Sequence, residues 1–232
     1  AWRASLPVRV AAVTGSNGKT TTKEMLTSIL RRSGPVLATA GNYNNELGVP
    51  LTLFGLSAEH DFAVIEMGCG KPGDIRYLAG LAKPEAGAVT NVGPAHLQGL
   101  RDAEGVARTK GELYAALPAA GCAIFNIEEP WLSLWEGLST AGNAQTFGFH
   151  ESADIRAVKS KEGWNIKTLD GDFALKLQLP GKHNVMNAMA ATGLALALGI
   201  GQELVQIVGM ADDDQPVARR QGQPGVGQLV GR

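Results

Sequence analysis

Short apolar runs alternate with stretches of helical periodicity over the first two-thirds of the chain. Residues 8–14 form an apolar run typical of a buried strand, and residues 19–32 place Met25, Leu26 and Ile29 on one face of a helix. The alternation continues, and it predicts strands at 36–39, 61–67, 86–91 and 122–126 and helices at 73–82, 103–117 and 129–136. This rhythm indicates an α/β fold of the P-loop type, with a mostly parallel sheet covered by helices on both faces.

The period changes after residue 143. The strand-like segments that follow lie at 144–149, 152–160, 164–169 and 173–179, and the Asp170-Gly171 pair between the last two marks a hairpin. We expect a small antiparallel sheet over about 144–180, followed by helices at 184–198 and 202–208. Residues 1–209 would form one domain, and residues 210–232, rich in Asp, Gly, Gln and Pro without periodicity, a linker or disordered tail.

The amino-acid composition of the chain argues against several classes of function. The chain has 21 basic and 22 acidic residues, so it has no electrostatic footprint for nucleic acid or for a membrane surface. Its two cysteines, Cys69 and Cys122, are too few for a disulfide scaffold and are expected as free thiols. No apolar run approaches the roughly 18 residues of a membrane span. A cytoplasmic protein is the expectation.

The junction between the first strand and the first helix carries candidate chemistry. It reads Thr14-Gly15-Ser16-Asn17-Gly18-Lys19-Thr20. Backbone N–H groups of such a turn face phosphates, Lys19 would reach the terminal phosphates of ATP, and Thr20 would hold Mg²⁺. The strict Walker pattern has a glycine where this chain has Val13, so the loop departs from that pattern. The alternative is an ordinary glycine-containing turn.

A phosphate loop without that first glycine resembles the loop of the Mur ligase and folylpolyglutamate synthase superfamily. Later segments resemble the family's other motifs in order and spacing, at 64–68, 91–97, 107–113 and 179–188. In the family these carry, in turn, a magnesium-binding glutamate, a magnesium-binding histidine, a lysine that is often carbamylated, and two asparagines on the adenine side of ATP. The resemblance covers about residues 7–209 and implies the central ATP-binding domain of an ATP-dependent ligase.

Roles for individual residues follow from this resemblance. It implies catalytic roles for Lys19, His96 and Lys110, with Lys110 as the carbamylated lysine. It implies one Mg²⁺ held by Thr20 and Glu66 and a second held by His96 and Lys110, because carbamylation turns an ammonium into a carboxylate. The residues implied in nucleotide binding are Thr14, Gly15, Ser16, Asn17, Gly18, Lys19, Thr20, Thr21, Asn184, Asn187 and, in a segment resembling the family's linker, Arg220.

Each of these side chains also has a structural explanation. Glu66 could be a solvated strand end, His96 a capping or surface residue, and Lys110 part of a solvated helix face. Asn184 stands where a residue that caps the next helix would stand. Asn187 lies one turn further in, where asparagine has no helical advantage, and this favours a ligand role.

Residues 39–53 resemble one branch of the family in particular. That branch joins D-alanyl-D-alanine to the UDP-N-acetylmuramoyl tripeptide in peptidoglycan synthesis. ATP activates a carboxylate as an acyl phosphate, which the amine of the second substrate then attacks. The resemblance implies that Asn42, Asn44 and Asn45 contact the nucleotide-sugar substrate, and a simple turn is the alternative.

Members of the family have three domains, and this chain resembles the central one. We expect the N-terminal UDP-binding domain and the C-terminal domain to be missing, and the chain alone to bind nucleotide with weak or no ligase activity. The alternatives are a folylpolyglutamate synthase-like ligase, another Mur ligase, a non-catalytic nucleotide-binding module, and a general P-loop ATPase or kinase. Substrate-dependent phosphate release would separate them.

Overall fold

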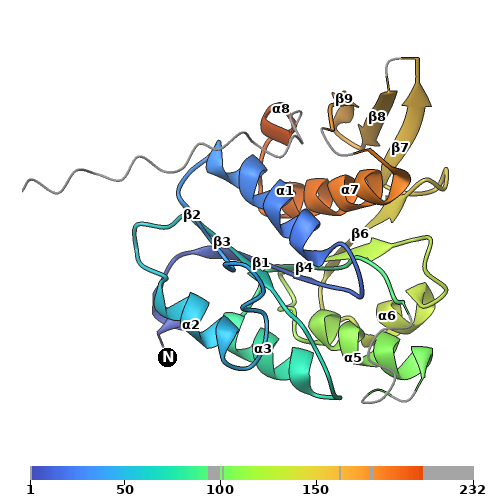
Figure 1. The fold of residues 1–232 in the computed structure, drawn as a ribbon. Helices are drawn as coiled ribbons and strands as arrows, with labels where there is room; N and C mark the ends of the chain where they lie inside the picture. Colours follow the sequence, from blue (N-terminus) through green and yellow to red (C-terminus); the bar gives the residue numbers. More distant parts are fainter. Residues whose placement is uncertain (1, 94–99, 101, 162, 178–179, 206–232) are drawn as a thin grey trace, which may run out of the picture.

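The computed structural model describes residues 2–93, 100, 102–161, 163–177 and 180–205. These residues form a nine-stranded sheet with the order β2-β3-β1-β4-β5-β6-β7-β8-β9 (Figure 1). The strands are β1 (Arg9–Thr14), β2 (Val36–Ala38), β3 (Phe62–Glu66), β4 (Ala86–Val89), β5 (Cys122–Asn126), β6 (Asn143–Gly148), β7 (Ile155–Ser160), β8 (Gly163–Thr168) and β9 (Gly171–Leu175). The helices are η1 (Arg3–Ser5), α1 (Lys19–Arg31), α2 (Gly48–Phe54), α3 (Asp74–Ala82), α5 (Ala103–Ala115), α6 (Leu132–Leu138), α7 (Lys182–Ala197) and α8 (Gln202–Val205).

Helices cover both faces of the sheet, as the sequence predicts. In Figure 1, α1 and α7 lie on one face, whereas α2, α3, α5 and α6 lie on the other. The pleat of β1 explains how one strand serves both layers, because successive side chains point to opposite faces. Ala11 and Val13 join the core under α1 and α7, and Val10 and Ala12 join the core under α2, α3 and α5. The α/β prediction is therefore confirmed.

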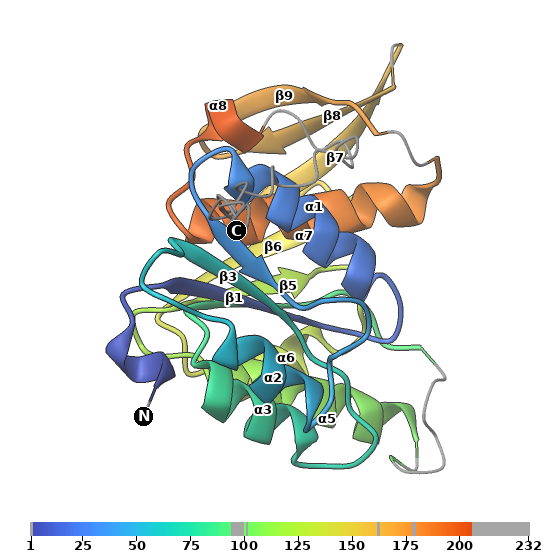
Figure 2. The same cartoon turned by 60° about the vertical axis from the view of Figure 1, so that its left-hand side comes forward.

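The antiparallel part begins later than the sequence suggests. β6 pairs in parallel with β5, and β7 pairs in parallel with β6 over Phe147 and Gly148. The antiparallel pairs are β7 with β8 and β8 with β9, and these strands extend the same sheet past β6 (Figure 2). The expected range of 144–180 for the antiparallel sheet was therefore wrong at its start. Only six residues join β6 to β7, and so short a connection usually joins antiparallel strands, because parallel strands need a longer crossover.

Several elements begin or end elsewhere than the sequence predicts. α7 begins at Lys182, so Asn184 lies inside its first turn, and its Nδ2 donates to Pro180 O at 2.9 Å. The interpretation of Asn184 as the helix cap is therefore wrong. α6 begins at Leu132, three residues later than predicted, after a turn that contains Pro130. The short helix α2 was not predicted at all.

Parts of several predicted elements lie outside the described residues, namely 178–179, 206–208 and the tail 210–232. Within the described part, none of the helices combines the length and the apolar character needed to cross a bilayer. Cys69 and Cys122 are free thiols, as expected.

Candidate functional site

The candidate site lies where the direction of the sheet's connections reverses. From β1 the chain moves outward to β2 and β3, and it then returns past β1 to β4. The carboxyl ends of β1, β3 and β4 consequently flank one another, because all three strands are parallel. In open α/β sheets such a reversal opens a crevice at the strand ends, and this is where ligands bind.

The phosphate loop connects β1 to α1, and two of its glycines have backbone conformations that favour glycine. Gly15 has φ +148° and Gly18 has φ +81°. A Cβ atom at Gly15 would collide with Thr90 Oγ1, and one at Gly18 would collide with Asn187 Oδ1. Val13, at the missing Walker glycine, is fully buried inside β1. Gly15 and Gly18 are therefore the loop residues whose backbone lies closest to the neighbouring side chains, Thr90 and Asn187.

Lys19 opens α1, and its side chain turns back over the loop. Its Nζ donates to Gly15 O at 2.9 Å and to Ser16 O at 3.2 Å. The ammonium thus lies beside the loop whose N–H groups and helix N-terminus favour an anion. This is the place that the sequence assigns to the terminal phosphates.

Residues just after β4 hydrogen-bond to the backbone of the phosphate loop. These contacts were not predicted from the sequence. Thr90 Oγ1 donates to Asn17 O at 2.6 Å. The Asn91 amide pairs with the Asn17 backbone in both directions, at 3.0 Å to Asn17 N and 2.9 Å to Asn17 O. The signal was available in the sequence, since Thr90 and Asn91 follow an apolar strand at the same sheet edge.

Glu66 and Thr20 form the candidate cation site. Glu66 ends β3 with 1% of its surface exposed, and its Oε2 accepts from Thr20 Oγ1 at 2.9 Å. Mg²⁺ takes hard oxygen ligands in an octahedron at about 2.0–2.1 Å, so adjacent ligand oxygens lie about 2.9 Å apart. The pair fits this requirement in both chemistry and spacing. The interpretation of Glu66 as a merely solvated strand end is wrong, because the side chain is buried.

The three asparagines before α2 take different positions. Asn44 Nδ2 donates to Glu66 Oε1 at 2.7 Å. Asn45 Oδ1 accepts from the N–H groups of Leu47 and Gly48, at 3.2 Å and 2.8 Å, so it closes the turn into α2. Asn42 is exposed and lines the adjoining pocket. Substrate contact by these residues stays a prediction.

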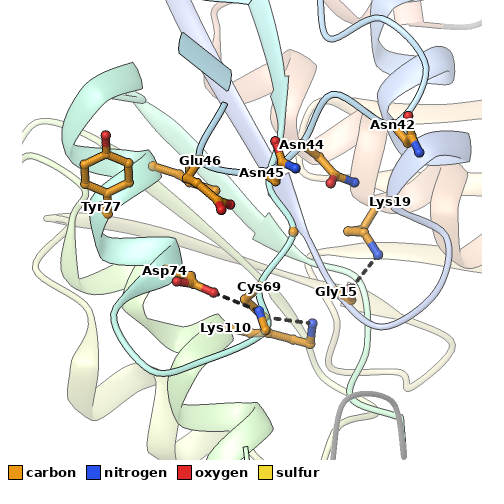
Figure 3. Close-up of a pocket in the computed structure, with 13 residues that line it drawn as sticks. Gly15, Lys19, Asn42, Asn44, Asn45, Glu46, Cys69, Asp74, Tyr77 and Lys110 are labelled. Atoms are coloured by element: carbon orange, nitrogen blue, oxygen red, sulfur yellow. Dashed lines mark hydrogen bonds between the residues drawn. The ribbon is translucent and has the colours of Figure 1, made fainter. Parts of the chain in front are cut away.

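Lys110 comes from α5 and is 2% exposed, so it does not belong to a solvated helix face. Its Nζ lies 3.7 Å from Cys69 Sγ. Burial lowers the pKa of Lys110, and burial raises the pKa of the Cys69 thiol. Lys110 and Lys19 reach one pocket of about 430 Å³ (Figure 3). The sequence reading missed other residues that line this pocket, among them Glu46, Cys69, Asp74 and Tyr77.

A second pocket, also of about 430 Å³, lies on the α7 side of the loop. Asn17, Gly18 and Asn187 line it together with the side chains of Phe149 and Met186. Sequence reasoning missed further lining residues, which are Thr90, Asn91, Asn126, Glu128, Glu129 and His183. Burial raises the pKa of Glu129, and the hydrogen bond from Val92 N opposes this. A flat ring between apolar side chains and amides suits this pocket.

His96 and Arg220 lie outside the described residues, so their predicted roles stay predictions. Over the described ranges, no three His, Cys, Asp or Glu side chains gather as a metal cluster. The cation site would thus rely on Thr20 and Glu66, with phosphate and water oxygens as further ligands. Such a small share of protein ligands is usual for Mg²⁺.

Comparison with known proteins identifies the family. The family model described as Mur ligase middle domain matches residues 13–195. The UDP-N-acetylmuramoyl-tripeptide–D-alanyl-D-alanine ligase of Escherichia coli (strain K12) is 41% identical over an alignment of 209 residues, and the alignment covers 86% of this chain and 46% of that protein. Crystal structure I of MurF from Acinetobacter baumannii superimposes with a TM-score of 0.81 and 37% identity, covering 88% of this chain and 46% of that one.

A further solved structure, MurF ligase from Thermotoga maritima in complex with ADP, has a TM-score of 0.76 and 30% identity over 85% of this chain and 47% of that one. The chain thus spans about half the length of the curated relatives it matches. The match at 13–195 contains the phosphate loop, Glu66, Lys110 and Asn187, so it includes the described site. The chain belongs to the Mur ligase middle-domain family.

Proposed function

We propose that this chain is the ATP-binding middle domain of a ligase that joins D-alanyl-D-alanine to UDP-N-acetylmuramoyl-tripeptide in peptidoglycan synthesis. The observation that carries the proposal is the meeting of the phosphate loop, the Thr20–Glu66 pair and a polar pocket at one sheet edge. The name of the Escherichia coli relative at 41% identity supports the choice of substrates. The ADP complex of the Thermotoga maritima relative supports nucleotide binding.

The chemistry divides into two displacements. A carboxylate oxygen of the tripeptide attacks the γ-phosphorus of ATP, the bond to the β–γ bridging oxygen breaks, and ADP leaves. The amine of the dipeptide then attacks the acyl carbon, inorganic phosphate leaves, and the nitrogen loses a proton. Lys19 and the loop N–H groups bind the phosphates and hold them in line. When Thr20 and Glu66 bind Mg²⁺, the ion neutralises part of the negative charge of the phosphates.

A second Mg²⁺ would use a carbamylated Lys110 and His96. The buried amine supports the first half of this idea, because its lowered pKa increases the neutral fraction that can add carbon dioxide. We expect a carbamate signal at Lys110 in ¹³C spectra of the chain equilibrated with ¹³C-bicarbonate. That signal should grow as pH rises and should vanish in Lys110→Met. An identical spectrum in the variant would exclude the modification.

The chain alone is expected to bind nucleotide with weak or no ligase activity, so the test uses the chain joined to the flanking domains of its Escherichia coli relative. Phosphate release from ATP is measured with the substrates added singly and together. A ligase of this specificity releases phosphate only when UDP-N-acetylmuramoyl-tripeptide is present, and it forms amide only when D-alanyl-D-alanine is added as well. Release with a folate substrate would support the folylpolyglutamate synthase alternative. Release without any acceptor would indicate a general ATPase, and binding without release under all conditions would support a nucleotide-binding module.

A further inference from the structure

Both oxygens of the Glu66 carboxylate are already engaged, each by a different part of the fold. Oε2 accepts from Thr20 Oγ1 at 2.9 Å, on the phosphate-loop side. Oε1 accepts from Asn44 Nδ2 at 2.7 Å, on the side of the loop that precedes α2. The backbone N–H of Glu66 donates to Thr39 Oγ1 at 3.0 Å. The carboxylate is therefore fixed in rotation, with one oxygen turned to the candidate cation site and the other turned away from it.

Asn44 is itself held in place. The backbone carbonyl oxygen of Asn44 accepts a hydrogen bond from Gly68 N at 2.7 Å, and this bond holds the loop against the chain just after β3. A Cβ atom at Gly68 would lie 2.8 Å from Asn44 Oδ1, so the amide fits against bare backbone there. Asn44 is half-buried. The amide thus resists a rotation of the Glu66 carboxylate.

This arrangement bears on which cation the site accepts. Mg²⁺ at about 2.0–2.1 Å is bound by one oxygen of a carboxylate, whereas Ca²⁺ at about 2.3–2.6 Å takes more ligands and often both oxygens of a carboxylate. For both oxygens of Glu66 to face one ion, the carboxylate would have to turn and lose its hydrogen bond to Asn44. A residue that hydrogen-bonds to a metal ligand, as Asn44 does to Glu66, orients that ligand and changes the affinity of the site for the metal.

We propose that Asn44 is a positioning residue that holds Glu66 as a one-oxygen ligand and so favours Mg²⁺ over Ca²⁺ at the nucleotide. The role rests on the proposed function, because it needs a cation between Thr20, Glu66 and the phosphates. It also gives Asn44 a task on the metal side of the pocket, in addition to the substrate contact that the sequence suggests.

The test is isothermal titration of the intact chain with the slowly hydrolysed analogue ATPγS in Mg²⁺, in Ca²⁺ and in EDTA. Asn44→Leu keeps much of the side-chain volume and removes the N–H donor. We expect its gain in affinity from Mg²⁺ to fall about tenfold relative to the unmodified chain. The gain from Ca²⁺ should be unchanged or larger, because the freed Oε1 can then join the ion, and the affinity in EDTA should be unchanged.

Two further variants keep the result interpretable. Asn143→Ala removes an exposed amide at the start of β6 and should leave the affinities in all three conditions unchanged. If Asn44→Leu melts well below the unmodified chain, the smaller Asn44→Ala is titrated instead, since it also lacks the donor, adds no charge beside Glu66 and should lose the Mg²⁺ preference. Mg²⁺ and Ca²⁺ gains that stay unchanged, or that fall by the same factor, would overturn the positioning role. Failure of the unmodified chain to bind ATPγS would instead contradict the proposed function.

Discussion

The two pockets beside the phosphate loop have equal volume and different chemistry. The pocket on the Glu66 side contains the two lysines Lys19 and Lys110, and a network of hydrogen bonds fixes its carboxylate ligand. Among the described residues, the pocket on the α7 side has no lysine in its lining; amides, the apolar side chains of Phe149 and Met186, and the titratable residues Glu128, Glu129 and His183 line it. The loop thus separates a region with two lysines from a region that offers apolar side chains and amides to a ring. Substitutions in the two regions should therefore affect different parts of the nucleotide.

The largest effect is expected for Lys19→Ala in the pocket with the two lysines. A charge-assisted hydrogen bond contributes about 1.5–3 kcal/mol, so ATPγS affinity should fall about tenfold to a hundredfold. Affinity for AMP, which lacks the terminal phosphates, should change little. Calorimetric titration with both nucleotides measures the difference, and an equal loss for AMP and ATPγS would contradict the separation of the two regions.

An intermediate effect is expected for Asn187→Ala on the α7 side. Loss of one neutral hydrogen bond costs about 0.5–1.5 kcal/mol, which is roughly twofold to tenfold in affinity. AMP and ATPγS should lose the same factor, because both carry the nucleoside. Asn143→Ala is the control, since it removes an exposed amide at the start of β6, away from both pockets. A loss confined to ATPγS would place Asn187 at the phosphates instead.

A smaller effect, on stability, is expected from Lys110. Burial lowers its pKa in the folded chain, so between that lowered pKa and the ordinary value of 10.5 the unfolded chain binds more protons. The free energy of unfolding should therefore rise with pH across that window. Lys110→Met should flatten this rise and be more stable at its acidic end. Urea unfolding in buffers free of carbon dioxide measures both, and parallel pH profiles of the two chains would contradict the assignment.

The smallest effect is expected for Glu129→Gln in the α7-side pocket. Burial raises the pKa of Glu129 above the ordinary value of 4.5, so the folded chain binds more protons and its stability falls as pH rises through this region. The variant should be slightly more stable at neutral pH, and its advantage should shrink as pH falls toward 4.5. Melting curves across this range measure it, and an advantage that grows in acid would have the wrong sign.

Much of the fold could be predicted from the sequence, because the positions of strands and helices depend on the local periodicity of apolar residues. The strand at Cys122–Asn126 and the start of α1 at Lys19 lie where the apolar pattern places them. The direction of β6 was not readable, since alternation along a strand carries no information on its partner. α2 was missed because the segment before it contains one glycine and three asparagines, which signal a turn. The contact of Asn45 with the first N–H groups of α2 becomes visible only in three dimensions.

The site divides in the same way. The phosphate loop is contiguous in sequence, so its spacing predicts its place. The partners of Glu66 come from segments 22 and 46 residues away, and the residues that bind the Asn17 backbone come from 73 and 74 residues away. Such pairings depend on strand order, which the sequence does not state. The resemblance to a known family supplied Glu66 and Lys110, whereas the hydrogen bond between Asn44 and Glu66 emerged from the fold.

The most direct test of the central claim is the effect of Mg²⁺ on ATPγS binding by the unmodified chain and by Glu66→Gln. If the loop and the Glu66 carboxylate form one ATP–Mg²⁺ site, calorimetry will show one nucleotide bound per chain. Mg²⁺ will tighten that binding in the unmodified chain, and the variant will bind as it does in EDTA. Equal tightening by Mg²⁺ in both chains, or no saturable binding in either, would contradict the account.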